Sequence, residues 1–98
     1  MAEPIVKFAQ LRLTEAGYQL SEEQLHALRV KGRQSFEKVG GKRLVACRSR
    51  WASVEWGGFG LQEFPNIEAL QEHMVDLEEL QWFRYFEVRS ILGTHWQP

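Results

Sequence analysis

The sequence has few of the residues that mark several common protein classes. Cys47 is its only cysteine, which excludes an internal disulfide and a zinc site built from cysteines. No apolar run is long enough to cross a bilayer, and the segment from Met1 to Pro4 does not begin a signal peptide. We therefore expect a cytoplasmic protein that does not associate with membranes.

The sequence also has almost no excess of charge of one sign, and it has few signs of a catalytic motif. The net charge is −1, so electrostatics alone predicts no nucleic-acid partner. His26, His73 and His95 are scattered without metal-ligand spacing, which predicts no metal site. No G-x-S-x-G segment is present to indicate a serine nucleophile. Function must therefore be argued from the fold and from isolated residues.

The chain does contain a regular succession of strand and helix signals. Its 98 residues are enough for a single domain with a small core, so we expect one domain over residues 1–98. The pattern predicts, in order, a strand, a helix, two strands, a helix and a strand. The expected ranges are 5–13, 21–39, 42–50, 56–64, 66–80 and a final aromatic-rich segment after 82.

Both helix starts carry clear capping signals. Ser21 is a good N-cap, and Gln24 completes a capping box with it. Asn66 is a second N-cap, and it follows Pro65, which should end the preceding strand. The helix after Asn66 has one apolar stripe and one acidic face. The segment from Gln81 to Tyr85 is left open between helix and strand. As a strand, alternation would place Trp82, Arg84 and Phe86 on one side, and Phe83 and Tyr85 on the other.

The order β-α-β-β-α-β is that of the ferredoxin-like α+β fold, a four-stranded antiparallel sheet with two helices on one face. The opposite face of the sheet would then be uncovered. Alternation along the first strand places Val6, Phe8, Gln10 and Arg12 together on one side. A large apolar face of this kind indicates an interface, and a second copy of the same sheet is its simplest cover. We therefore expect a homodimer.

Two segments carry a resemblance to a known superfamily. The run from Phe64 to Leu70, followed by the run from Trp82 to Phe86, resembles the dimeric α+β barrel superfamily. That superfamily includes small antibiotic-biosynthesis-type monooxygenases, haem-degrading monooxygenases, muconolactone isomerases and many uncharacterised proteins. The resemblance covers the whole chain in layout and mainly residues 59–94 in sequence. It implies a dimeric α+β barrel and a small-molecule ligand.

The resemblance also points to candidate catalytic residues. His73 lies on the helix that carries a histidine in haem-degrading and some monooxygenase relatives, where it would act as an iron ligand or a proton shuttle. The alternative is a partly buried histidine with no role in catalysis. Gln10 is the nearest equivalent of an asparagine that those enzymes use. Tyr85 is the second catalytic candidate, through its hydroxyl group.

A pocket for a flat apolar ligand needs aromatic walls and a few polar groups. The residues that we expect to bind such a ligand are Gln10, Arg12, Trp56, Trp82 and Arg84. The competing interpretation is that the aromatic side chains fill the core and the dimer interface. No cofactor is expected, although the resemblance leaves haem open.

A different class of function starts from the segment between Gly58 and Phe64. It resembles the glycine-aromatic-glycine motif of RNA-recognition domains, which share this topology. Three features count against it: Gly57 stands in place of a basic residue, Leu61 stands in place of an aromatic one, and Glu63 adds negative charge.

We therefore expect a dimeric barrel protein that binds an aromatic or polyketide-like molecule, as a cofactor-independent monooxygenase or isomerase. A non-enzymatic homodimeric module is the alternative, and an RNA-binding domain is third.

Overall fold

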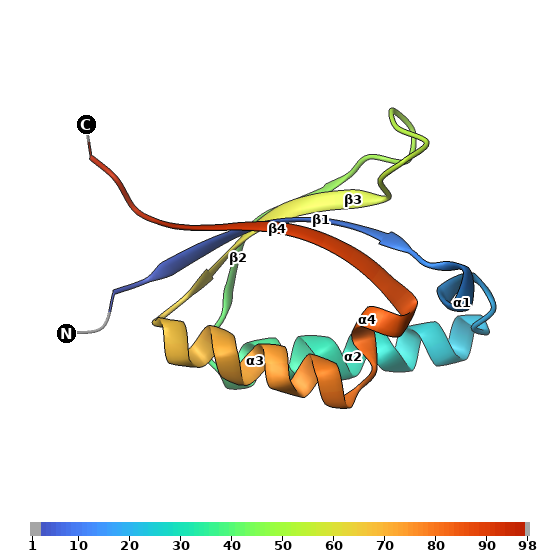
Figure 1. The fold of residues 1–98 in the computed structure, drawn as a ribbon, viewed down its shortest axis with the longest axis horizontal. Coiled ribbons are helices and arrows are strands. Elements are labelled where there is room, and N and C mark those ends of the chain that lie inside the picture. The colour runs from blue at the N-terminus through green and yellow to red at the C-terminus, as the bar shows by residue number, and fades with distance from the viewer. Residues whose placement is uncertain (1–2, 98) are drawn as a thin grey trace.

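The computed structural model describes residues 3–97, which form one four-stranded sheet and four helices. The helices lie together on one side of the sheet, and the other side is bare (Figure 1). The elements in chain order are β1 (Ile5–Leu13), α1 (Glu15–Tyr18), α2 (Glu22–Lys38), β2 (Lys42–Arg48), β3 (Gly58–Phe64), α3 (Ile67–Glu79), α4 (Trp82–Tyr85) and β4 (Phe86–Thr94).

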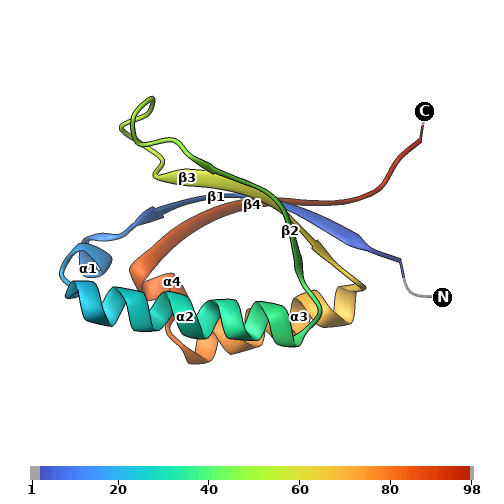
Figure 2. The ribbon, with the colours of Figure 1, turned by 180° about the vertical axis from the view of Figure 1, so that it is seen from behind.

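The sheet has the strand order β2-β3-β1-β4, and every neighbouring pair is antiparallel. The two long helices, α2 and α3, run across the same face of it (Figure 2). This is the ferredoxin-like α+β arrangement that the sequence predicts. The order of strands and helices is therefore confirmed, with two short helices added to it.

The capping residues hold the helix ends as expected. The Ser21 hydroxyl accepts from the Gln24 amide, and the Gln24 side chain accepts in return from the Ser21 amide. The Asn66 side chain accepts from the Ala69 amide at 2.8 Å and starts α3. At the other end of α2, Gly40 adopts φ +85°, a left-handed conformation that glycine takes without strain.

A compact cluster joins the sheet to the two long helices near one end. Phe64 is completely buried there and meets the Phe36 ring edge to face, at 5.4 Å between centroids. The other members of this cluster are Val39, Ala69 and Leu70, with Ile5 and Met74 packed against them. The cluster therefore fixes α2 and α3 over the ends of β1 and β3.

The segment from Trp82 to Tyr85 is a helical turn and not the start of the last strand. α3 ends at Glu79 with Leu80 as its C-cap, Gln81 takes the left-handed conformation at φ 58°, and the Arg84 amide then donates to the Gln81 carbonyl. The sequence expectation of strand alternation over residues 82–86 is therefore wrong. Tertiary contacts decide this conformation, because aromatic residues are by themselves better strand formers than helix formers.

The segment from Thr14 to Tyr18, expected to be a loop, also contains a helical turn. The Thr14 hydroxyl accepts from the Gly17 amide and donates to the Arg84 carbonyl, while the Thr14 amide donates to the Tyr85 carbonyl. These bonds tie α1 to α4. They depend on residues about seventy positions apart, so local sequence does not report them.

Gly32 on α2 faces the ring of Trp82. A Cβ atom at Gly32 would lie 2.8 Å from Cζ3 of Trp82. The Trp82 ring in turn stacks on Phe86, with centroids 4.3 Å apart. The missing side chain thus makes room for an aromatic ring between α2 and the sheet.

Candidate functional site

A cavity of about 340 Å³ lies between the sheet and the helices, beyond the buried cluster. Strands β1, β2, β3 and β4 contribute one side of it, and α2, α3 and α4 contribute the other. The lining residues are Lys7, Ala9, Leu11, Arg29, Gly32, Arg33, Phe36, Arg43, Gln62, His73, Leu77, Trp82, Phe83 and Val88. The size and the mixture of apolar and polar walls are those of a small-molecule site.

The sheet side of the cavity carries a row of three polar residues. Lys7 on β1 is paired with Gln62 on β3, and Gln62 is paired with Arg43 on β2. Residues paired across antiparallel strands project to the same face of a sheet. The three long side chains therefore stand side by side on the face that the helices cover.

Lys7 is the buried member of this row. Lys7 is 5% exposed, and among the described residues Nζ donates only to the Met74 thioether sulfur, at 3.7 Å. A thioether is a weak acceptor, whereas an ammonium group offers three donors. Burial lowers the pKa of the Lys7 amine below its ordinary value, because removal from water penalises the charged form.

His73 on α3 is held in one tautomer by two residues outside the sheet. Ser35 Oγ lies 2.6 Å from Asp76 Oδ2 and 2.8 Å from His73 Nδ1. The single hydroxyl proton of Ser35 goes to the carboxylate, the stronger acceptor, so Nδ1 carries a proton and donates it to Ser35. Nε2 is then the nitrogen with a free lone pair, and residues 3–97 offer it no hydrogen-bond partner.

The surroundings of His73 keep its ring neutral. The ring lies 5.7 Å from the Phe36 and the Phe64 centroids and is 5% exposed. Burial lowers the pKa of His73 to about 4, with a further contribution from the positive charge of Lys7. The pKa of Asp76 is also lowered, first by the Ser35 hydrogen bond and then by Lys38, so this carboxylate remains an anion that accepts from Ser35.

The helix side of the cavity combines aromatic rings with two exposed arginines of α2, Arg29 and Arg33. Trp82 enters from α4 over the space left at Gly32, and Phe83 follows it in the wall. Phe36 completes this side from α2. A flat apolar ring would therefore meet aromatic surface on one side and the polar row on the other.

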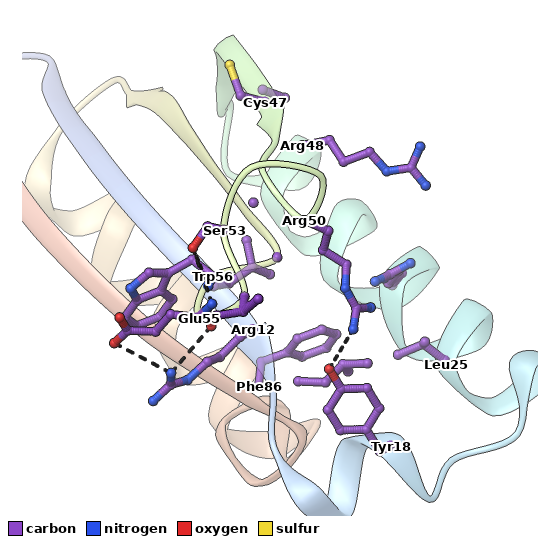
Figure 3. Close-up of a pocket in the computed structure, with 17 residues that line it drawn as sticks. Arg12, Tyr18, Leu25, Cys47, Arg48, Arg50, Ser53, Glu55, Trp56 and Phe86 are labelled. Atoms are coloured by element: carbon purple, nitrogen blue, oxygen red, sulfur yellow. Dashed lines mark hydrogen bonds and ion pairs between the residues drawn. The ribbon is translucent and has the colours of Figure 1, made fainter.

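A second hollow, of about 800 Å³, lies at the far end of β1, beside the loop between β2 and β3 (Figure 3). Arg12 reaches Glu87 at 2.8 Å and lies over the Trp56 ring at 4.7 Å from its centroid. Arg50 donates to the Tyr18 hydroxyl at 2.9 Å. Arg12 with Glu55, and Arg50 with Tyr18, are thus already paired, whereas the Arg48 guanidinium has no partner among the residues drawn in Figure 3.

The residues that the sequence predicts to form one site lie in different parts of the structure. His73 and Trp82 line the cavity together. Arg12 and Trp56 line the second hollow, and Gln10 pairs with Phe59 and Arg89 on the bare face of the sheet. Arg84 and Tyr85 lie on α4 with the guanidinium 5.5 Å from the Tyr85 ring. The roles of all these residues in binding or catalysis remain predictions.

The polar row is absent from the sequence-based expectations. Its signal was the lysine at position 7, which alternation places on the same side as Ala9 and Leu11. A lysine is almost never fully buried in a protein unless it is paired. Gln62 and Arg43 gave no such signal, because their place beside Lys7 depends on strand pairing.

No family model matches the chain, and no curated protein matches its sequence. Solved structures do match. A protein of unknown function from Rhodopseudomonas palustris superposes with a TM-score of 0.70 at 19% identity, covering 100% of this chain and 86% of that one. A methylated form of it gives a TM-score of 0.68 at 18% identity, covering 100% and 84%.

SnoaB, a cofactor-independent oxygenase from Streptomyces nogalater, superposes with a TM-score of 0.58 at 9% identity, covering 99% of this chain and 97% of that one. These likenesses confirm the ferredoxin-like α+β fold. Identities this low carry no conclusion about activity.

Two further findings concern metal sites and membrane-spanning helices. Within residues 3–97, no three histidine, cysteine, aspartate or glutamate side chains are grouped so that they could hold a metal ion. None of the helices there has the length and apolar character needed to cross a membrane.

Proposed function

We propose that this protein binds a flat aromatic or polyketide-like molecule in the cavity between the sheet and the helices. It then acts on this molecule as a cofactor-independent monooxygenase or isomerase. The observation that carries the proposal is the neutral His73, held with Nε2 as a free acceptor in the wall of a cavity that also has aromatic surface. The cofactor-independent oxygenase SnoaB, which has the same fold, supports it.

Both reactions begin with removal of a proton from a carbon acid, and a neutral imidazole is a suitable acceptor. Ser35 and Asp76 orient the ring and stabilise the imidazolium that forms, because Asp76 already accepts from Ser35. In an isomerase the proton returns at another carbon of the same molecule. In an oxygenase the carbanion passes electrons to dioxygen, so no metal or cofactor is needed.

Anthrone, a flat tricyclic carbon acid, is a suitable probe for this chemistry. Anthrone and one O₂ give anthraquinone and one water, a reaction followed with an oxygen electrode. We expect His73→Gln to lower the enzymatic rate by roughly 10²-fold or more, the usual contribution of a general base. His26→Gln is the control, because His26 is exposed on α2 outside the cavity. Equal rates for His73→Gln and the unchanged protein would remove His73 from the proposal.

The proposal includes a homodimer formed through the bare face of the sheet. Phe8 pairs with Leu61 and Ile91 on this face, and Ile91 is 70% exposed. Phe59 and Val45 extend the same apolar surface. A continuous apolar surface on a sheet is costly in water, and an identical sheet covers it with two-fold symmetry.

The alternative function is a homodimeric module without catalysis. The apolar face supports it as well as it supports the enzyme, since that face is independent of the cavity. Anthrone that binds in the cavity but is not oxidised or rearranged faster than in buffer would favour this alternative.

A further inference from the structure

The cavity between the sheet and the helices carries positive charge that the described chain does not neutralise. Its wall contains no aspartate or glutamate among residues 3–97, but it contains four cationic side chains, Lys7, Arg29, Arg33 and Arg43. The ion pairs of the described residues involve other cations, namely Arg12, Lys38 and His95. The acidic residues of the chain thus lie elsewhere.

Lys7 is the most buried of the four cations. It is 5% exposed, whereas the three arginines are exposed at the edge of the cavity. Its contact with the Met74 sulfur at 3.7 Å cannot replace the three hydrogen bonds that water gives an ammonium group. A buried charge is normally paired with an opposite charge. An anion bound in the cavity would supply this missing partner.

We propose that the ligand of this cavity carries a carboxylate attached to its flat ring, and that Lys7 pairs with this carboxylate. The inference rests on the proposed function and adds the chemical class of the ligand to it. Gln62, beside Lys7 in the row, has amide N–H groups that can donate to the second carboxylate oxygen. Arg43, next in the row, adds positive charge at the edge of the cavity.

This arrangement also orients the ligand. With the carboxylate against the β1–β3 side of the cavity, the attached ring extends toward Trp82 and Phe36 on the helix side. His73 lines the same cavity with its Nε2 unpartnered. The carboxylate therefore selects and positions the molecule, and the imidazole acts on another part of it.

The test compares two probes of the same shape, 2-naphthoate and 2-naphthamide, by isothermal titration calorimetry at pH 7 and low salt. The unchanged protein should bind 2-naphthoate at least about tenfold more tightly, the effect of one charge-assisted hydrogen bond in a buried site. Lys7→Met should abolish this preference and leave the affinity for 2-naphthamide within about twofold. Lys42→Met is the matched control, because Lys42 is exposed at the start of β2 and does not line the cavity.

The possible results distinguish a failure of the carboxylate inference from a failure of the proposed function. Equal affinities in the unchanged protein would overturn the carboxylate inference but leave the flat-ligand site intact. A preference that survives in Lys7→Met would overturn the role of Lys7. Failure of the unchanged protein to bind either probe would overturn the proposed function and this inference with it.

A second measurement uses the unchanged protein, in case Lys7→Met does not fold. Acetic anhydride acetylates free amines, and peptide mass spectrometry reports the extent of reaction at Lys7. At equal occupancy, 2-naphthoate should slow acetylation of Lys7 several-fold more than 2-naphthamide does, and should not affect Lys42. Equal protection by the two probes would overturn the proposed pairing.

Discussion

The two faces of the sheet differ in the side chains that they carry near the middle of β1. The face toward the helices carries Lys7, Gln62 and Arg43 in a row inside a cavity. The bare face carries Phe8 and Phe59, whose rings lie 6.2 Å apart, at the centre of an apolar surface. At these positions protein folding alone would favour the reverse, as it does at Phe64, which is apolar and fully buried under the helices.

The difference between the two faces shows which side chains of the sheet stabilise the protein and which do not. Apolar side chains on the bare face become favourable as soon as a second sheet covers them. Lys7 beneath the helices has no such explanation in the chain itself. Residues that oppose stability in this way gather at functional sites.

The largest effect should come from placing charge on the bare face. Phe8→Glu would bury an unpaired carboxylate against its symmetry mate in the proposed dimer, so we expect it to weaken association by roughly 10²-fold or more. Analytical ultracentrifugation measures the change. Val75→Glu is the control, because Val75 is 52% exposed on α3 and faces away from the sheet. A Phe8→Glu protein that dimerises like the control would show that the bare face is not the interface.

The next effect concerns acid stability and comes from the helix-facing side. The pKa of His73 is about 4 in the folded protein and close to 6.5 when unfolded. Between these values the unfolded state binds a proton that the folded state does not, so stability falls as the pH drops from 6.5 toward 4. The loss should reach about 3 kcal/mol at pH 4.

Urea unfolding of the unchanged protein and of His73→Gln at pH 7 and at pH 4.5 isolates this contribution. The difference in unfolding free energy between the two pH values should be smaller in His73→Gln, since glutamine does not titrate. The same pH dependence in both proteins would mean that His73 is solvated and not buried beside Lys7.

A smaller effect should come from removing the charge at position 7. Methionine has a length close to that of lysine and needs no partner, so Lys7→Met should raise the free energy of unfolding by about 1–2 kcal/mol. Lys42→Met should change it by less than about 0.5 kcal/mol. Thermal unfolding of both variants at pH 7 measures this. A destabilised but folded Lys7→Met protein would contradict the view that Lys7 is retained for function.

The order of elements could be predicted from the sequence because its signals are local. Ser21 with Gln24, and Asn66 after Pro65, mark the helix starts within a few residues. The turn at Trp82–Tyr85 could not be predicted in this way, because its carbonyl groups are bound by Thr14 in a distant part of the chain.

The sequence likewise predicts only part of the candidate site. The resemblance to a known superfamily points to His73, and the abundance of aromatic residues points to Trp82. The row from Lys7 to Arg43 exists only once three strands are paired, and a bulge between Arg43 and Val45 shifts the register beside it. Ser35 and Asp76, which orient His73, come from two helices whose packing the sequence does not state.

The most direct test of the central claim is a crystal structure of the protein with 2-naphthoate. We predict electron density for the ring in the cavity between the sheet and the helices, against Trp82. We also predict a carboxylate oxygen within about 4 Å of Lys7 Nζ, the distance of an ion pair. A cavity filled by its own side chains, or a probe bound instead in the hollow between Tyr18 and Trp56, would contradict the account.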